Sequence, residues 1–197
     1  MGSREQKWTD ILQAAINVFS ECGFDKAKME YVAKAAGIGK GTIYEYFASK
    51  EALFREVILF SIQTYNDGLR EAMSRGENIV QKLVNCSRYN LAFLDSHIDM
   101  MQLALNVNIL SKEMRTQLIE TRTVIQQQFT DLVQGAKKSG ELRADLDAEL
   151  AALCIMGTID QFASQQVFSL ERRPLNQINH QAIINLLLQG LRNSSNV

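Results

Sequence analysis

The chain has 197 residues, enough for one large domain or for a small domain joined to a larger one, and its composition is that of an ordinary globular protein. The formal net charge of −1 gives no argument for nucleic-acid binding, which must rest on where a few lysines lie. No apolar run reaches the length of a bilayer span and the first ten residues are polar, so neither a membrane segment nor a secretory signal is expected. The cysteines Cys22, Cys86 and Cys154 are odd in number and far apart, which favours buried thiols and a cytoplasmic protein.

Helix is expected almost throughout, because the chain holds one proline and many strong helix formers. Apolar residues at helical spacing predict a first helix over residues 7–22, and Gly23 ends it in the left-handed conformation. A short helix is expected over 29–36. Gly37 breaks it, and a third helix then includes Ile43–Phe47.

The rest of the chain predicts further helices and no strand, so the expected fold class is all-α. Ser49 is expected to cap a long helix over 50–75. Helices then follow over 76–94, 98–110, 112–138 with Ser111 as cap, from Asp145 or Asp147 to about 169, and over 179–192.

The span from residue 29 to 48 reads MEYVAKAAGIGKGTIYEYFA and fits a helix-turn-helix. Such a unit needs a small residue where the helices cross, supplied by Ala33, and a turn residue that tolerates positive φ, supplied by Gly37. Apolar residues must clamp the two helices together, and Val32, Ala36, Ile38 and Ile43 are spaced to do so.

In a helix-turn-helix the second helix enters the major groove of DNA by its N-terminal end. Here Gly39 and Gly41 allow close approach, Lys40 suits a phosphate or a guanine edge, and Thr42 suits a base. The hydroxyl groups of Tyr44 and Tyr46 suit phosphate oxygens, as does the ammonium group of Lys50. Since Tyr44 and Tyr46 are two residues apart on a helix, one of them is expected to be partly buried.

The segment also has features of other structural motifs. Short helix-turn-helix patterns also occur in ordinary helical hairpins. Residues 37–42 resemble a phosphate-binding loop, but that loop requires Ser or Thr directly after Gly-Lys and a preceding strand. The preceding helix also excludes a dinucleotide-binding fingerprint.

A wider match supports DNA binding, because the flanks before and after the motif also resemble the tetracycline-repressor (TetR) family. The matching stretches are Ile11–Ala15, Phe19, Gly23–Phe24, Val32–Phe47 and Ser49–Leu53. The resemblance implies a DNA-binding domain at 1–50 and a helical effector-binding and dimerisation domain at 51–197. It further implies a homodimer that represses transcription at palindromic operator DNA and is released by a small hydrophobic effector.

The family's DNA contacts carry over to Lys40, Gly41, Thr42, Tyr44, Tyr46 and Lys50. Two positions depart from the family pattern. Gly39 stands where the family often has serine, and Lys28 where it often has Thr or Ser. A hydroxyl contact to phosphate is lost at each, and the charge of Lys28 can replace one of them.

The pattern after residue 58 is less specific. Aromatic and methionine side chains suit an adaptable apolar pocket, although any one of them can equally be a core residue. The candidate ligand contacts are Tyr65, Tyr89, Phe93, Met101, Phe129 and Phe162. The helices over 146–169 and 179–192 are more apolar than one core face requires, which favours pairing with a second copy, unless they complete a monomer's core.

The alternative hypotheses are an enzyme and a helical interaction protein that does not bind DNA. The histidines His97 and His180 have no Cys or carboxylate at a convincing ligand spacing and are expected to be surface or capping residues. No serine lies in a strand-turn-helix setting. The sequence therefore predicts no catalytic site, metal site or cofactor.

Overall fold

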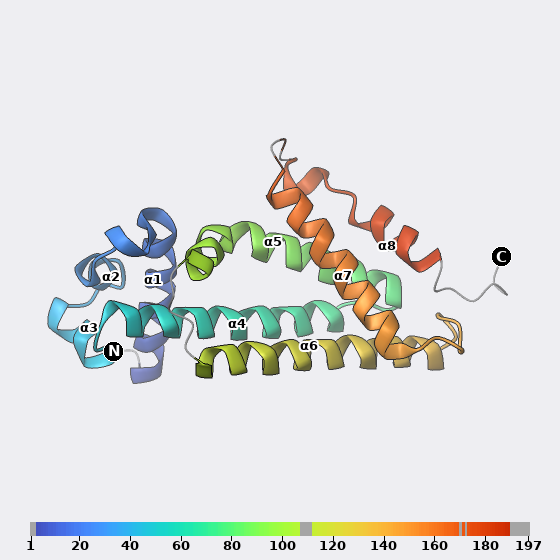
Figure 1. The fold of residues 1–197 in the computed structure, drawn as a ribbon, viewed down its shortest axis with the longest axis horizontal. Coiled ribbons are helices and arrows are strands. Elements are labelled where there is room, and N and C mark those ends of the chain that lie inside the picture. The colour runs from blue at the N-terminus through green and yellow to red at the C-terminus, as the bar shows by residue number, and fades with distance from the viewer. Residues whose placement is uncertain (1–2, 107–111, 170, 172, 190–197) are drawn as a thin grey trace. The chain divides into compact units, whose positions relative to one another are not determined.

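The computed structural model describes residues 3–106, 112–169, 171 and 173–189, with the side chains of 98–106 and 113 left aside. Within these ranges the regular elements are helical (Figure 1). They are α1 (Arg4–Lys26), α2 (Met29–Ala35), α3 (Lys40–Tyr46), α4 (Lys50–Ser74), α5 (Ile79–Asn106), α6 (Lys112–Lys138), α7 (Ala148–Val167), a 3₁₀ turn (Leu175–Gln177) and α8 (His180–Gln189).

The chain divides into two compact units, which are described separately. The first unit contains residues 1–64 and 97–117, and the second contains residues 65–96 and 118–197. The helices α4, α5 and α6 each contribute residues to both units. The all-α fold class expected from the sequence is confirmed.

The core of the first unit is built around aromatic rings of α1 and α4. The rings of Phe19 and Phe54 meet edge to face at 5.1 Å, and those of Phe24 and Phe54 lie 4.9 Å apart. Gly23 interrupts α1 with φ 75°, as its position predicted, and a further helical turn then continues to Lys26. This break lets Phe24 reach the core, where it is buried.

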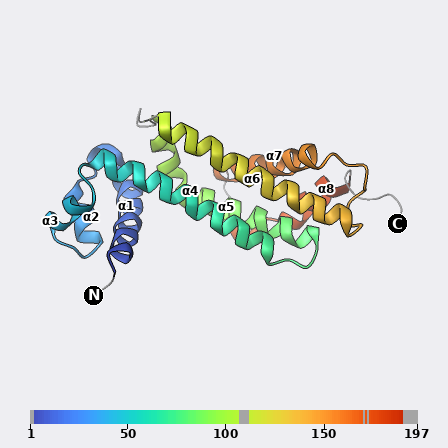
Figure 2. The same ribbon diagram turned by 90° about the horizontal axis from the view of Figure 1, so that it is seen from below.

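The core of the second unit receives buried side chains from five helices, among them Leu69, Leu83, Val133, Ile155 and Ile184. The parts of α4 and α6 in this unit lie side by side in both ribbon views (Figures 1 and 2). A hydrogen bond joins them, because Gln128 Nε2 donates to Asn66 Oδ1 at 3.1 Å.

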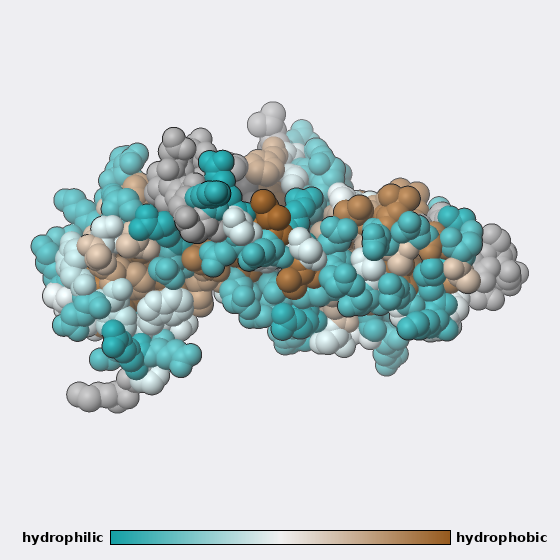
Figure 3. Space-filling view, turned by 60° about the horizontal axis from the view of Figure 1, so that its bottom comes forward, coloured by the Kyte–Doolittle hydropathy of each residue, from teal (hydrophilic) through white to brown (hydrophobic). Residues whose placement is uncertain are grey.

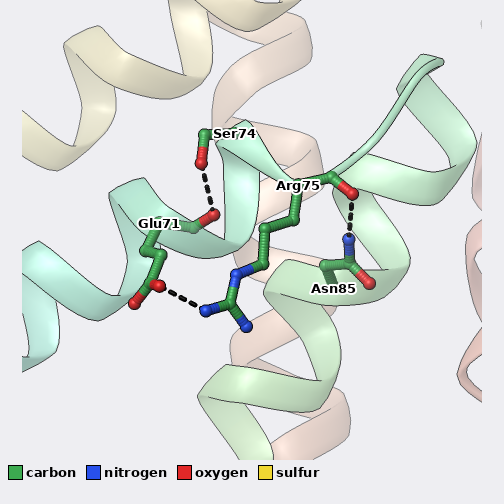
Figure 4. A network of polar contacts seen from close by, with 4 residues as sticks. All are labelled: Glu71, Ser74, Arg75 and Asn85. Atoms are coloured by element: carbon green, nitrogen blue, oxygen red, sulfur yellow. Dashed lines mark hydrogen bonds and ion pairs between the residues drawn. The ribbon is translucent and has the colours of Figure 1, made fainter.

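A small polar network ends α4 and holds it against the start of α5 (Figure 4). Ser74 Oγ donates to the carbonyl of Glu71 at 2.8 Å, and Arg75 forms an ion pair with the Glu71 carboxylate. Asn85 Nδ2 donates to the carbonyl of Arg75 at 3.4 Å. Backbone groups that the helix end leaves without partners are satisfied in this way.

The helix boundaries in the middle of the chain correct one expectation. The two helices expected over 76–94 and 98–110 form the single helix α5, which begins at Ile79 rather than at Gly76. Asn78 Oδ1 caps its first turn by accepting from Gln81 N at 2.9 Å. Residues 94–98 contain no glycine or proline that would break a helix. Ser96 Oγ bonds to the carbonyl of Phe93 within it.

Candidate nucleic-acid interface and effector region

The helices α2 and α3 form the helix-turn-helix that the sequence predicted. Gly37 in the turn has φ 66°, and the amide of Ile38 donates to the carbonyl of Ala33 at 2.9 Å. Val32, Ala33 and Ile43 are buried between the helices. The small residue, the left-handed glycine and the apolar clamp therefore occupy their expected places.

The opposite side of α3 is open to solvent. Gly39, Lys40, Gly41 and Tyr44 are exposed and Thr42 is half-buried. A Cβ added at Gly41 would meet no atom within 4 Å, so the surface above this residue is free. The N-terminal end of α3 therefore presents small and polar residues, as an element that enters the major groove requires.

Lys40 has a partner that the sequence analysis missed. Its Nζ lies 2.7 Å from Oε1 of Glu30 on α2. Their hydrogen bond lowers the pKa of Glu30 and raises the pKa of Lys40. The i, i+10 spacing of these residues gives no local signal for the pair, which depends on the angle between the helices.

Tyr44 and Tyr46 differ in burial, which confirms that one of the two is partly buried. Tyr44 is 46% exposed, whereas Tyr46 packs against the core of the first unit. The Arg4 guanidinium lies 5.8 Å from the centroid of the Tyr46 ring. These two residues line an open groove of about 390 Å³ together with Glu5 and Trp8. Arg4 therefore shares a surface with the end of α3, which was not expected from the sequence.

The two remaining lysines of the predicted interface are placed differently from each other. Lys28 is exposed before α2, and its Nζ lies 5.8 Å from the centroid of the Tyr31 ring. Lys50 Nζ instead donates to three backbone carbonyls, those of Phe24, Asp25 and Ala27.

In the second unit the structure brings together three of the six predicted ligand contacts. The rings of Tyr65, Tyr89 and Phe93 lie 5.0 to 6.0 Å apart as a three-ring cluster on α4 and α5. Phe129 is buried in the core, and the ring of Phe162 lies 5.7 Å from that of His180. The side chain of Met101 lies outside the described residues.

A chain of polar side chains adjoins the aromatic cluster. Tyr65 Oη donates to Asn90 Oδ1 at 2.8 Å, and Asn90 Nδ2 donates to Asp160 Oδ1 at 3.3 Å. Burial raises the pKa of Tyr65, and the charge of Asp160 raises it further. Burial of the carboxyl group also raises the pKa of Asp160, against the opposing effects of Arg122 and the Asn90 hydrogen bond. Hydrogen-bonding side chains therefore lie next to the three-ring cluster in the second unit.

Two further polar groups of the second unit are buried. Gln128 Oε1 is enclosed with no hydrogen-bond partner among the described residues. His180, expected at the surface or as a cap, is buried at 6% exposure, with Nδ1 2.9 Å from Ser87 Oγ. Burial, together with the charge of Arg88, lowers its pKa. The surface expectation was wrong because the apolar face of α8 packs inward and takes His180 with it.

Outward-facing apolar residues gather on α7 and α8. Leu150 is 60% exposed, Leu153 is 44% exposed and Leu186 is 69% exposed. Cys154 and Gly157 of α7 are also exposed. Figure 3 shows one face of the molecule, on which hydrophilic residues predominate and hydrophobic residues form several separate patches. Unburied leucines on two helices suit contact with another polypeptide.

Among the described residues, no group of three His, Cys, Asp or Glu side chains is arranged to hold a metal ion. No helix in the described ranges has the length and apolarity needed to cross a membrane.

Comparisons with known proteins agree with this geometry. Residues 11–57 match the family model "Bacterial regulatory proteins, tetR family", and residues 76–164 match "Tetracyclin repressor-like, C-terminal domain". The fold and the exposed α3 define a helix-turn-helix DNA-binding protein. The chain belongs to the TetR family of transcriptional regulators. Its relatives in this family are regulators and not enzymes.

Several known proteins and solved structures match nearly the whole chain. The fatty acid metabolism regulator protein of Bacillus subtilis is 28% identical, over 98% of this chain and 100% of its own. The structure of the fatty acid degradation regulator FadR from Bacillus halodurans has a TM-score of 0.69 at 26% identity and covers 94% of this chain and 100% of its own. The structure of FadR from Bacillus subtilis in complex with stearoyl-CoA has a TM-score of 0.70 at 24% identity, with coverage of 94% and 100%.

Proposed function

We propose that the protein is a repressor that binds a palindromic operator as a homodimer and releases it when a long-chain acyl thioester binds the second unit. DNA binding is assigned to Lys28 and to Gly39, Lys40, Gly41, Thr42, Tyr44 and Tyr46 of α3 and its cap. The exposure of Gly39, Lys40, Gly41 and Tyr44 on a helix-turn-helix supports this assignment. The proposed domain border near residue 50 follows from the end of this motif.

The effector is inferred from the second unit and from the relatives. The structure of a similar protein holds stearoyl-CoA, and a relative that covers 98% of this chain is named as a fatty acid metabolism regulator. The observation that carries the proposal is the aromatic cluster of Tyr65, Tyr89 and Phe93 next to the Tyr65–Asn90–Asp160 hydrogen bonds. Rings that accept an alkyl chain beside groups that bind a carbonyl suit an acyl ligand.

The dimer is inferred from α7 and α8. Their exposed leucines and Gly157, at which added atoms would meet nothing within 4 Å, suit a close two-fold contact with a second copy. Such a dimer would set two copies of α3 about 34 Å apart, one turn of DNA.

Induction requires that the effector binds one arrangement of the dimer better than the other. Helix α4 is continuous from Lys50 in the first unit to Ser74 in the second. It therefore supplies a physical connection between Tyr65 of the aromatic cluster and the helix-turn-helix. A ligand that displaces this helix would alter the spacing of the two α3 helices without touching DNA.

The test begins with an operator selected from a pool of random duplexes. Fluorescence anisotropy then measures its affinity with stearoyl-CoA, with stearate and with coenzyme A alone. We expect stearoyl-CoA to weaken binding by at least about tenfold, in keeping with a typical coupling energy, and coenzyme A alone to have no effect. A matched variant, Tyr65→Phe, keeps the ring and removes the hydroxyl group. It should raise the stearoyl-CoA concentration required to release the operator. Unchanged operator affinity at saturating stearoyl-CoA would refute the effector assignment, and failure to select any duplex would refute DNA binding.

A further inference from the structure

Lys50, the first residue of α4, directs its ammonium group at the connection between α1 and α2. Nζ donates to the carbonyl of Phe24 at 2.7 Å and to those of Asp25 and Ala27 at 3.2 Å each. It also lies 4.5 Å from the centroid of the Phe24 ring. An ammonium group has three N–H donors, so the three carbonyls occupy all of them.

These carbonyls belong to a backbone segment that lacks regular partners. Gly23 interrupts α1 with φ 75°, and the helix ends at Lys26 shortly afterwards. The last carbonyls of a helix have no partner within it and carry the negative end of its dipole. Two of the three hydrogen bonds, to Phe24 and Ala27, are partly buried. Removing the donor would therefore leave carbonyls poorly solvated, which destabilises the segment.

We propose that Lys50 is a positioning residue of the helix-turn-helix and not a phosphate contact. Its ammonium group fixes residues 24–27 on the start of α4, and α2 begins two residues later at Met29. The buried side chains of Val32 and Ile43 pack α2 against α3, so the position of α2 determines the position of α3. A DNA phosphate would have to take a donor away from these carbonyls. The inference rests on the proposed DNA binding, but its first test requires no DNA.

The first measurement is amide hydrogen exchange of residues 24–31 in the free, full-length protein. Lys50→Met keeps the apolar stem and removes the ammonium group, and we expect exchange in this segment to rise by about tenfold or more. Lys50→Arg retains charged donors and should restore most of the protection. Lys26→Met, which removes an exposed charge in the last turn of α1, is the matched control and should exchange as the wild type does.

The second measurement is the salt dependence of operator affinity. A lost phosphate contact lowers the slope of log affinity against log salt by about one unit. Lys50→Met should weaken binding with an unchanged slope, whereas Lys40→Met should lower the slope without faster exchange in residues 24–31. Loss of a positioning residue therefore speeds exchange and leaves the salt slope unchanged. Loss of a phosphate contact lowers the salt slope and leaves exchange unchanged.

A slope lowered by about one unit in Lys50→Met, or exchange no faster than in Lys26→Met, overturns the proposal. If Lys50→Met does not fold while Lys26→Met and Lys40→Met do, the positioning role is supported, because a residue that only contacts DNA is not needed for folding. If the wild type binds no DNA, the proposed function fails, and the exchange comparison still decides the role of Lys50.

Discussion

Glu30 forms an ion pair with Lys40, a proposed DNA contact, on the exposed side of the helix-turn-helix. A phosphate that binds Lys40 would have to compete with this carboxylate and would be repelled by it. We therefore expect Glu30→Gln to raise affinity for operator and unrelated duplexes alike, by about three- to tenfold at moderate salt. Anisotropy titrations check this, with Glu21→Gln on α1 as a charge-matched control. Equal affinities of Glu30→Gln and the wild type would contradict the prediction.

Gly68 leaves room for Tyr89, since a Cβ at residue 68 would lie 2.2 Å from the Tyr89 hydroxyl oxygen and 2.3 Å from Cζ. The rigid ring would have to move to make room for the methyl group. We expect Gly68→Ala to destabilise the protein by about 1–3 kcal/mol in chemical denaturation. In a Tyr89→Ala background the same change should become neutral or stabilising.

Gly135→Ala is the matched control for this experiment, because a Cβ at this position in α6 would meet nothing within 4 Å. It should stabilise the protein by up to about 1 kcal/mol through helix propensity. If both glycine variants have the same effect on stability, the effect of Gly68→Ala does not come from contact with Tyr89.

His180 makes stability depend on pH in a definite direction. Because burial lowers its folded-state pKa, the unfolded chain binds the proton more readily. The contribution of neutral, buried His180 to the free energy of unfolding is fully present above the pKa of an unfolded histidine, about 6.5. It is lost as the pH falls below that value. Denaturation midpoints between pH 7.5 and 5 should therefore fall less steeply in His180→Asn than in the wild type.

At the scale of the helices, the start of α7 depends on one carboxylate. Asp147 Oδ1 accepts from the amides of Glu149 and Leu150 at 2.9 and 3.0 Å. The sequence left open whether Asp145 or Asp147 begins this helix, and the structure selects Asp147. We expect Asp147→Ala to lower the free energy of unfolding by about 1 kcal/mol. Asp145→Ala, exposed and outside the helix, should change it little; a reversed order would contradict the cap assignment.

At the scale of the whole molecule, α7 and α8 are proposed to pair with their copies. Leu153→Glu combined with Leu186→Glu places charges on exposed positions, so it should convert the dimer to a monomer without disturbing the core. Sedimentation should show the loss of the dimer, and the unfolding temperature should no longer depend on protein concentration. Ile119→Glu, at a residue 67% exposed on α6, is the control. A wild-type protein that sediments as a 22.2 kDa monomer would refute the dimer.

The sequence by itself determined the all-α class, the helix-turn-helix and most helix ends. These features depend on residues within a turn or two of one another, such as Gly37 with its positive φ and Ser49, whose Oγ accepts from Ala52 N. Hydrophobic periodicity likewise predicted that Val32 and Ile43 are buried. Local conformational preference is enough to predict such features.

The tertiary structure decided which side chains meet across large separations in the chain. Ser87 and His180 are 93 residues apart, and Lys50 reaches Phe24 across 26 residues. Leu187 is half-buried against the core, while its neighbour Leu186 faces solvent. One residue rotates a helical side chain by about 100°, so the outward face depends on how the helices pack. Local sequence does not specify that packing angle, because it results from the combined burial of residues on several helices.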